Sequence, residues 1–159
     1  MRRSDRDITD FDEIAAIMQK CDVCRIALNT EDYPYIVPLN FGMAVKDHTI
    51  ELYFHGALEG TKYDLMRRDD RVCFERDCGH KLMLEEDTGN CTMGYWSVIG
   101  RGRMVILPEE EKRDGLRILM AHYRAEDFAY NEAVVPRTNV FKLVVESVTG
   151  KARLCREKQ

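Results

Sequence analysis

The sequence has no apolar run long enough to cross a membrane and no excess of positive charge. Its 159 residues carry a formal net charge of −4, so no overall basic field favours nucleic-acid binding. The charged opening segment, residues 1–6, is not followed by the apolar core of a signal peptide. We therefore expect a cytoplasmic protein that binds neither nucleic acid nor membrane.

Internal repeats, low-complexity segments and linkers rich in Pro, Gly or Ser are also absent. The length is usual for one domain, and a composition of 45% hydrophobic and 33% charged residues allows both a buried core and a polar surface. The sequence thus predicts a single domain over residues 1–159.

Six cysteines are present, but without a secretion signal they are expected to be reduced thiols rather than a disulfide framework. Cys21 and Cys24 form a C-x-x-C pair, a spacing found in redox pairs and in half zinc sites. No standard zinc spacing joins this pair to the other candidate ligands, which are Cys73, Cys78, His80 and Cys91. We expect no metal site, and a redox role for the pair stays open.

Apolar periodicity predicts a helix at 10–20, a second at 61–68 and a third after Pro108. The first follows Thr9-Asp10-Phe11-Asp12, which resembles a capping box with Asp in place of Glu. Strands are expected at 22–28, 34–45, 49–55, 71–77, 93–107 and 138–149. Segment 34–45 is predicted to be mostly buried, with an edge or a bulge at Pro38 because proline donates no ladder hydrogen bond.

The first three strands have short connections, which favour antiparallel pairing, and no Rossmann alternation of strands and helices is present. The predicted fold is mainly β (α+β), an antiparallel sheet curled into a barrel with peripheral helices. Such a sheet on a short chain leaves apolar strand faces uncovered, and this favours a two-fold homodimer.

Three segments could bind a ligand. Residues 55–62 (HGALEGTK) end a strand, pass two glycines and open a helix, whose N-terminal N–H groups favour phosphate. Residues 97–102 (SVIGRG) place a serine hydroxyl beside a glycine-bent strand. In residues 34–42 (PYIVPLNFG), Pro38 leaves neighbouring backbone groups free to bond the edge of a flat ring. Taken singly, each is explained as well by an ordinary turn, bend or edge strand.

The set of motifs is more specific than its members. In order, they are 35–42, 52–57 (LYFHGA) with Gly60 and Lys62, 72–75 (VCFE), 97–102 and 144–151 (VVESVTGK). Together, from Met1 to about Lys151, they resemble the nitroimidazole-resistance (Nim-like) branch of the pyridoxamine 5'-phosphate oxidase-like FMN-binding flavoproteins.

The resemblance implies a six-stranded split barrel and a homodimer with two FMN molecules at its interface. It implies that Pro38, Leu39, Asn40 and Phe41 border the isoalloxazine ring. It further implies that His55, Gly56 and Ala57 lie near the cofactor, and that the phosphate is held by Lys62 with Ser97, Val98, Ile99 and Gly100. Trp96 departs from the basic or polar residue expected before Ser97. It either packs or stacks on a ligand.

The leading hypothesis is an FMN-dependent oxidoreductase that passes electrons from NADH or NADPH to a small acceptor such as a nitroaromatic. His55 would donate a proton to the reduced acceptor. Vitamin B6 oxidation is disfavoured, because no second basic cluster for another phosphate is evident. Two alternatives remain: a non-enzymatic flavin carrier or sensor, and a haem-binding split barrel with His55 as axial ligand.

Overall fold

The structure, a computed structural model, describes residues 4–153; Met1–Arg3 of the resemblance and Cys155 lie outside the described residues. Its helices, with η marking 3-10 turns, are η1 (Ser4–Arg6), α1 (Phe11–Lys20), α2 (Thr61–Arg68), η2 (Glu109–Glu111), α3 (Lys112–His122) and η3 (Glu132–Arg137). Its strands are β1 (Asp7–Ile8), β2 (Cys24–Leu28), β3 (Tyr35–Leu39), β4 (Gly42–Lys46), β5 (Thr49–Ala57), β6 (Arg71–Glu85), β7 (Asn90–Ile106) and β8 (Thr138–Arg153). None of these helices is long and apolar enough to span a bilayer.

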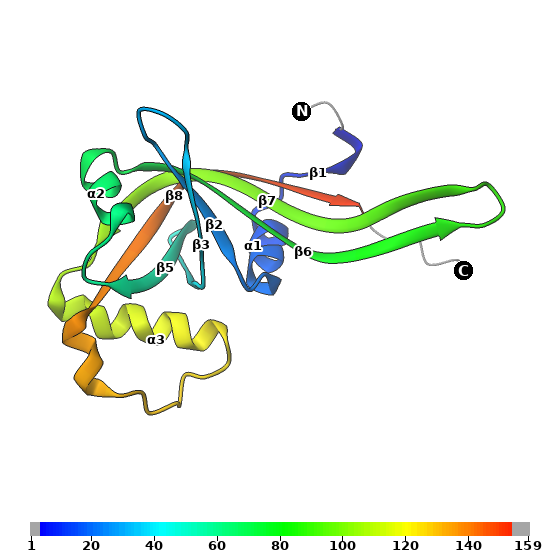
Figure 1. The fold of residues 1–159 in the computed structure, drawn as a ribbon. Helices are drawn as coiled ribbons and strands as arrows, with labels where there is room; N and C mark the ends of the chain where they lie inside the picture. Colours follow the sequence, from blue (N-terminus) through cyan, green and yellow to red (C-terminus); the bar gives the residue numbers. More distant parts are fainter. Residues whose placement is uncertain (1–3, 154–159) are drawn as a thin grey trace.

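The strands form one antiparallel sheet in the order β3-β2-β6-β7-β8-β5-β4, and β1 pairs with β8. The sheet curls but does not close, so β3 and β4 are its two edges (Figure 1). All six expected segments contain strands. The prediction of a mainly antiparallel split barrel with peripheral helices is confirmed, and the strand count rises because one segment divides and β1 is added.

The prediction of one mostly buried strand over residues 34–45 is wrong. The chain leaves the sheet at Asn40 and Phe41, so that β3 pairs with β2 and β4 pairs with β5 on opposite edges. Pro38 lies on the edge strand, as its missing N–H requires, opposite Arg25. Because β3 has a neighbour on one side only, all of its side chains stay exposed or half-buried.

The first helix begins one residue later than its sequence pattern suggested. Asp10, not Thr9, is the N-cap of α1, and its Oδ1 accepts a hydrogen bond of 2.8 Å from the backbone N–H of Glu13. This cap satisfies one of the free N–H groups at the helix start. The same start orients Ile14, Ile17 and Met18 into the core.

The sheet has an inner and an outer face. Alternation in β5 places Leu52 and Phe54 inward, where they pack with Phe141 and with the apolar sides of α1 and α2. Helix α3 covers the outer face of the other half of the sheet, against β4, β5 and β8. The two helical layers therefore lie on opposite faces of β5.

Strands β6 and β7 continue past the body of the protein as a long two-stranded arm (Figure 1). The arm begins where the register shifts between Cys78 and Lys81. Leu82 is paired with Met93 and Leu84 with Cys91, and directly opposed residues share a face. One face of the arm is therefore exposed and apolar.

Candidate functional site

The junction between β5 and α2 carries a positive charge that no acidic side chain neutralises. Gly60 is the N-cap of α2, with φ of 138°, and no side chain caps the helix. Lys62 makes no ion pair with any residue between 4 and 153. Its ammonium lies 4.5 Å from the centroid of the Tyr63 ring, a contact that leaves the charge unneutralised. An uncapped helix start beside such an ammonium favours an anion.

Gly56 allows this ammonium to come close to β5. The strand extends through Ala57, two residues beyond its predicted end. A Cβ at Gly56 would lie 3.1 Å from Lys62 Nζ and 2.6 Å from Tyr63 Oη. The Tyr63 hydroxyl is buried, which raises its pKa, although an interaction with Asn139 lowers the pKa in part. The structure thus brings Gly56 and Lys62 together.

Lys62 also borders a small apolar hollow on the inner side of the sheet, which is too narrow to admit a water molecule. Leu39 lies in the same hollow, so one predicted ring contact and the predicted phosphate contact are neighbours. The remaining lining is apolar and comprises Ile26, Leu28, Val37, Met66, Met104 and Phe141. The stem of Lys62 packs here while its ammonium reaches the junction.

His55 points away from this hollow. It precedes Gly56 on β5, and successive strand residues face opposite sides. Its imidazole lines a cavity of about 160 Å³ beneath α3. His55 is exposed to solvent on one side, but the packing around its ring and secondly the charge of Lys62 lower the pKa of His55, so the neutral imidazole is favoured near pH 7.

Three of the four residues at 38–41 do not lie beside Lys62. Pro38 faces outward, and the side-chain amide of Asn40 donates to Asp22 O at 3.3 Å and to Tyr123 Oη at 3.1 Å. Phe41 is fully buried, and its N–H donates to Tyr123 Oη at 3.2 Å. The ring and the N–H of Phe41 are therefore already engaged within the fold.

Residues 97–100 lie in the middle of β7. Ser97 stands between Asp77 of β6 and Lys151 of β8. Val98 is buried, whereas Ile99 is 56% exposed on the same outer face as Ser97. Gly100 packs against the Phe74 ring. Trp96 points inward and packs against the core, with Lys20 Nζ 5.4 Å from its ring centroid.

A single chain does not bring Ser97 to Lys62. Met104 lines the hollow beside Lys62, and Ser97 lies seven residues away along β7. Seven residues correspond to about 23 Å of strand, and an odd step places the two side chains on opposite faces. If both residues hold one phosphate, they must come from two chains.

The outer face that carries Ser97 is exposed in one chain. Ile36, Ala27, Cys73 and Arg101 form a row of directly opposed residues across four strands. Ile36 is 63% exposed, although it belongs to a strand. A sheet face with such side chains is suited to burial against another protein surface.

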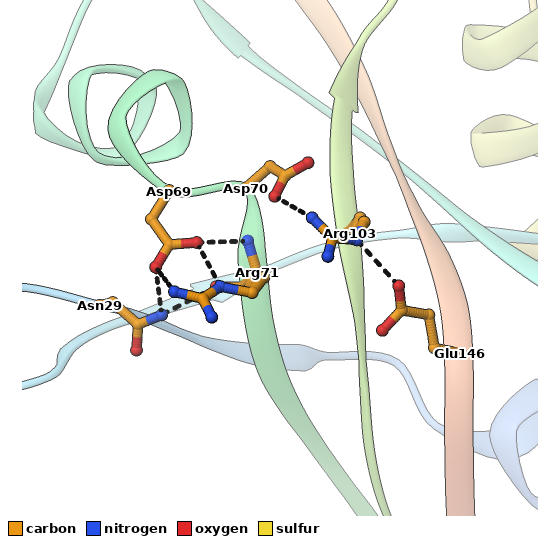
Figure 2. A network of polar contacts seen from close by, with 6 residues as sticks. All are labelled: Asn29, Asp69, Asp70, Arg71, Arg103 and Glu146. Atoms are coloured by element: carbon orange, nitrogen blue, oxygen red, sulfur yellow. Dashed lines mark hydrogen bonds and ion pairs between the residues drawn. The ribbon is translucent and has the colours of Figure 1, made fainter.

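Charged groups near α2 are engaged with one another. Asp69 accepts from the Asn29 amide and from the Arg71 guanidinium, and Arg103 joins Asp70 to Glu146 (Figure 2). The Arg71 guanidinium lowers the pKa of Asp69 below its usual range. Arg71 and Arg103 therefore have carboxylate partners, whereas Lys62 contacts the Tyr63 ring and pairs with no carboxylate of residues 4–153.

The sequence reasoning missed Arg76, whose side chain is 0% exposed. Its Nη1 donates to Met18 O at 3.1 Å, and its guanidinium carbon lies 3.5 Å from the Phe41 ring centroid. Nε and Nη2 have no hydrogen-bond partner among residues 4–153. Burial lowers the pKa of Arg76, and the neighbouring Cys24 opposes this. Alternation from Val72 and Phe74 was the signal that could have placed Arg76 inside.

The C-x-x-C cysteines lie in the same buried region. Cys21 and Cys24 are buried free thiols. Burial raises the pKa of Cys21 to about 12 and also raises the pKa of Cys24, although Arg76 opposes the latter. Within the described part of the chain, no three Cys, His, Asp or Glu side chains are placed to hold a metal ion.

The comparisons with known proteins agree with this architecture. The sequence profile of the pyridoxamine 5'-phosphate oxidase family matches residues 10–152. A candidate 5-nitroimidazole antibiotic resistance protein from Bacteroides thetaiotaomicron is 34% identical in sequence, with a TM-score of 0.79. That match covers 92% of this chain and 86% of the other.

Two more distant structures share the fold. A flavocytochrome from Azotobacter vinelandii is 18% identical, with a TM-score of 0.78, over 98% of this chain and 72% of its own. An FAD- and haem-binding protein from Mycobacterium smegmatis is 16% identical, with a TM-score of 0.79, over 97% and 76%. No curated protein matches the sequence. From the family match and the 34% identical relative, the chain belongs to the pyridoxamine 5'-phosphate oxidase-like family.

Proposed function

We propose that the chain is an FMN-dependent oxidoreductase, active as a homodimer, that passes electrons from NADH or NADPH to a small acceptor. The observation that carries this proposal is the unneutralised Lys62 at an uncapped helix start, separated from the exposed Ser97 face of the same chain. A second copy supplies what one chain lacks. Each phosphate would then lie between Lys62 of one protomer and Ser97 of the other.

The residues present fit a phosphorylated flat ring. The start of α2 and the Lys62 ammonium suit the phosphate. Leu39, half-buried on the edge strand β3, suits one ring face, and the outer face around Pro38, Ile36 and Ile99 offers the second wall. Bound FMN would supply the redox chemistry, and the chain would bind it, orient it and exclude water.

A nitroaromatic acceptor is supported by the relative from Bacteroides thetaiotaomicron, described as a candidate 5-nitroimidazole resistance protein. His55 is the candidate proton donor for an acceptor on the side of β5 opposite Lys62, where its imidazole lines the cavity beneath α3. Its lowered pKa reduces the protonated fraction near neutrality but leaves it able to release a proton readily. Replacing His55 with Ala should retain FMN and slow acceptor reduction; unchanged turnover would remove it from this role.

Haem ligation by His55 is not supported. The two distant relatives that carry haem or FAD share only the fold with this chain.

The test begins with the absorption spectrum and the mass of any cofactor that co-purifies. Two flavin bands and the mass of FMN are expected; FAD or a Soret band would contradict the assignment. Anaerobic addition of NADH or NADPH should then bleach the flavin, and a nitroimidazole should restore its colour. Bound flavin without either response would identify a carrier or sensor instead.

A further inference from the structure

The cavity beneath α3 is a separate feature from the phosphate site. It has a volume of about 160 Å³, is partly open to solvent and lies on the outer face of β5, the side opposite Lys62. Five of its lining residues are apolar, and these are Leu116, Leu119, Met120, Val134 and Val135. Its polar lining is limited to His55, Tyr130 and Thr138. The Thr138 hydroxyl already donates to Val134 O at 2.9 Å.

We infer that this cavity binds an uncharged compound with one aromatic ring, held by a hydrogen bond to His55. A cavity near 150 Å³ with apolar walls is large enough for a benzene ring. No Lys, Arg, Asp or Glu lines it, so an ionised ligand would lose hydration without gaining a partner. A neutral imidazole offers both an acceptor and a donor nitrogen to a polar group on the ring.

The position of the cavity relates it to the proposed phosphate site. His55 forms part of its wall and also precedes Gly56, which contacts Lys62. A ring bound beneath α3 would therefore lie next to the strand end that carries the proposed phosphate site. Segment 130–135, with η3, covers the cavity on the other side, and Val134 is 40% exposed there. Entry past this segment does not require the core to open.

The claim that the cavity holds the electron acceptor rests on the proposed function, whereas the claim that it binds an aromatic ring does not. We would therefore measure binding with three probes and no nicotinamide, using chemical-shift changes of the protein methyl groups. Phenol carries one ring and a donor, benzene has the ring alone, and benzoate carries a charge. Shifts confined to Leu116, Met120, Val134 and Val135 are expected for phenol and benzene.

The hydrogen bond to His55 should favour phenol over benzene by about 2- to 12-fold in Kd. His55→Ala should abolish this preference while benzene still binds. Benzoate should bind more weakly than either. Tightest binding by benzoate would overturn the inference and indicate an anion site at Lys62, and so would a phenol preference that survives in His55→Ala.

A variant that fills the cavity gives an independent control. Met120→Trp should prevent binding of both rings, and Leu84→Trp on the exposed arm should leave it unchanged. Far-ultraviolet circular dichroism checks that each variant is folded. If Met120→Trp does not fold, the comparison of wild type with His55→Ala still tests whether the ring binds beside His55. If the wild-type protein binds FMN but neither ring, the cavity assignment alone is refuted, whereas if it binds the rings but no FMN, the proposed function alone is refuted.

Discussion

Replacement of Lys62 by Met tests the proposed phosphate contact directly. Methionine keeps a flexible apolar stem in the hollow formed by Leu39, Met66 and Met104, and removes only the charge. The ammonium makes no ion pair within residues 4–153, so its loss should change the stability of the fold little. Hydrogen bonds to charged groups contribute about 1.5–3 kcal/mol, which corresponds to a rise in the Kd for FMN of about 10- to 160-fold.

The assay is a fluorescence titration of the protein, stripped of cofactor, with FMN and separately with riboflavin. Riboflavin lacks the phosphate, so its Kd should be the same in wild type and Lys62→Met. The matched control is Lys81→Met, which removes the same charge from the exposed arm, opposite Gly94. An unchanged Kd for FMN, or equal losses for FMN and riboflavin, would refute the reasoning, because neither result identifies a phosphate contact.

Two further predictions concern the fold. Burial opposes the charge on Glu51, but hydrogen bonds from Lys142 at 2.6 Å, Tyr53 and Lys46 outweigh it and hold its pKa below the usual value. The contribution of ionised Glu51 to the free energy of unfolding is therefore fully present above the unfolded pKa of about 4.3. It is lost as the pH falls through the pKa of Glu51 in the folded protein. Glu51→Gln should lower the free energy of unfolding, measured in urea at pH 7, by about 1–3 kcal/mol. An equal difference between the variant and the wild type at pH 3 would contradict this prediction. Gly102→Ala would place a Cβ against the backbone oxygen of Val144, so it should lower stability by about 1–3 kcal/mol, and an unchanged unfolding midpoint would disprove the close approach.

Local signals predicted much of the fold. Helix α2 has the predicted bounds, residues 61–68, because Gly60 and the apolar spacing act within a few residues of one another. The alternation of Ile50, Leu52 and Phe54 correctly gave the inner face of β5. Edge placement of Pro38 follows from one missing N–H and needs no tertiary information.

The remaining features depend on contacts between distant residues. The break at Asn40 and Phe41 falls in an apolar run, and it is stabilised by Tyr123, which is more than 80 positions away. The burial of Arg76 requires Met18 O and the Phe41 ring in place. For the candidate site, the sequence placed Lys62 beside Gly56, but it did not show that Ser97 faces the other way, because this depends on strand register.

Mixed dimers test the shared phosphate site most directly. Lys62→Met and Ser97→Asp homodimers should each bind FMN weakly, since each carries one damaged partner in both sites. Coexpressed and purified as a heterodimer through two different tags, they should regain one wild-type site, and therefore bind half an equivalent of FMN per chain with wild-type affinity. Weak binding at every site of the heterodimer would contradict the account, because it would place Lys62 and Ser97 in the site of the same chain or outside it.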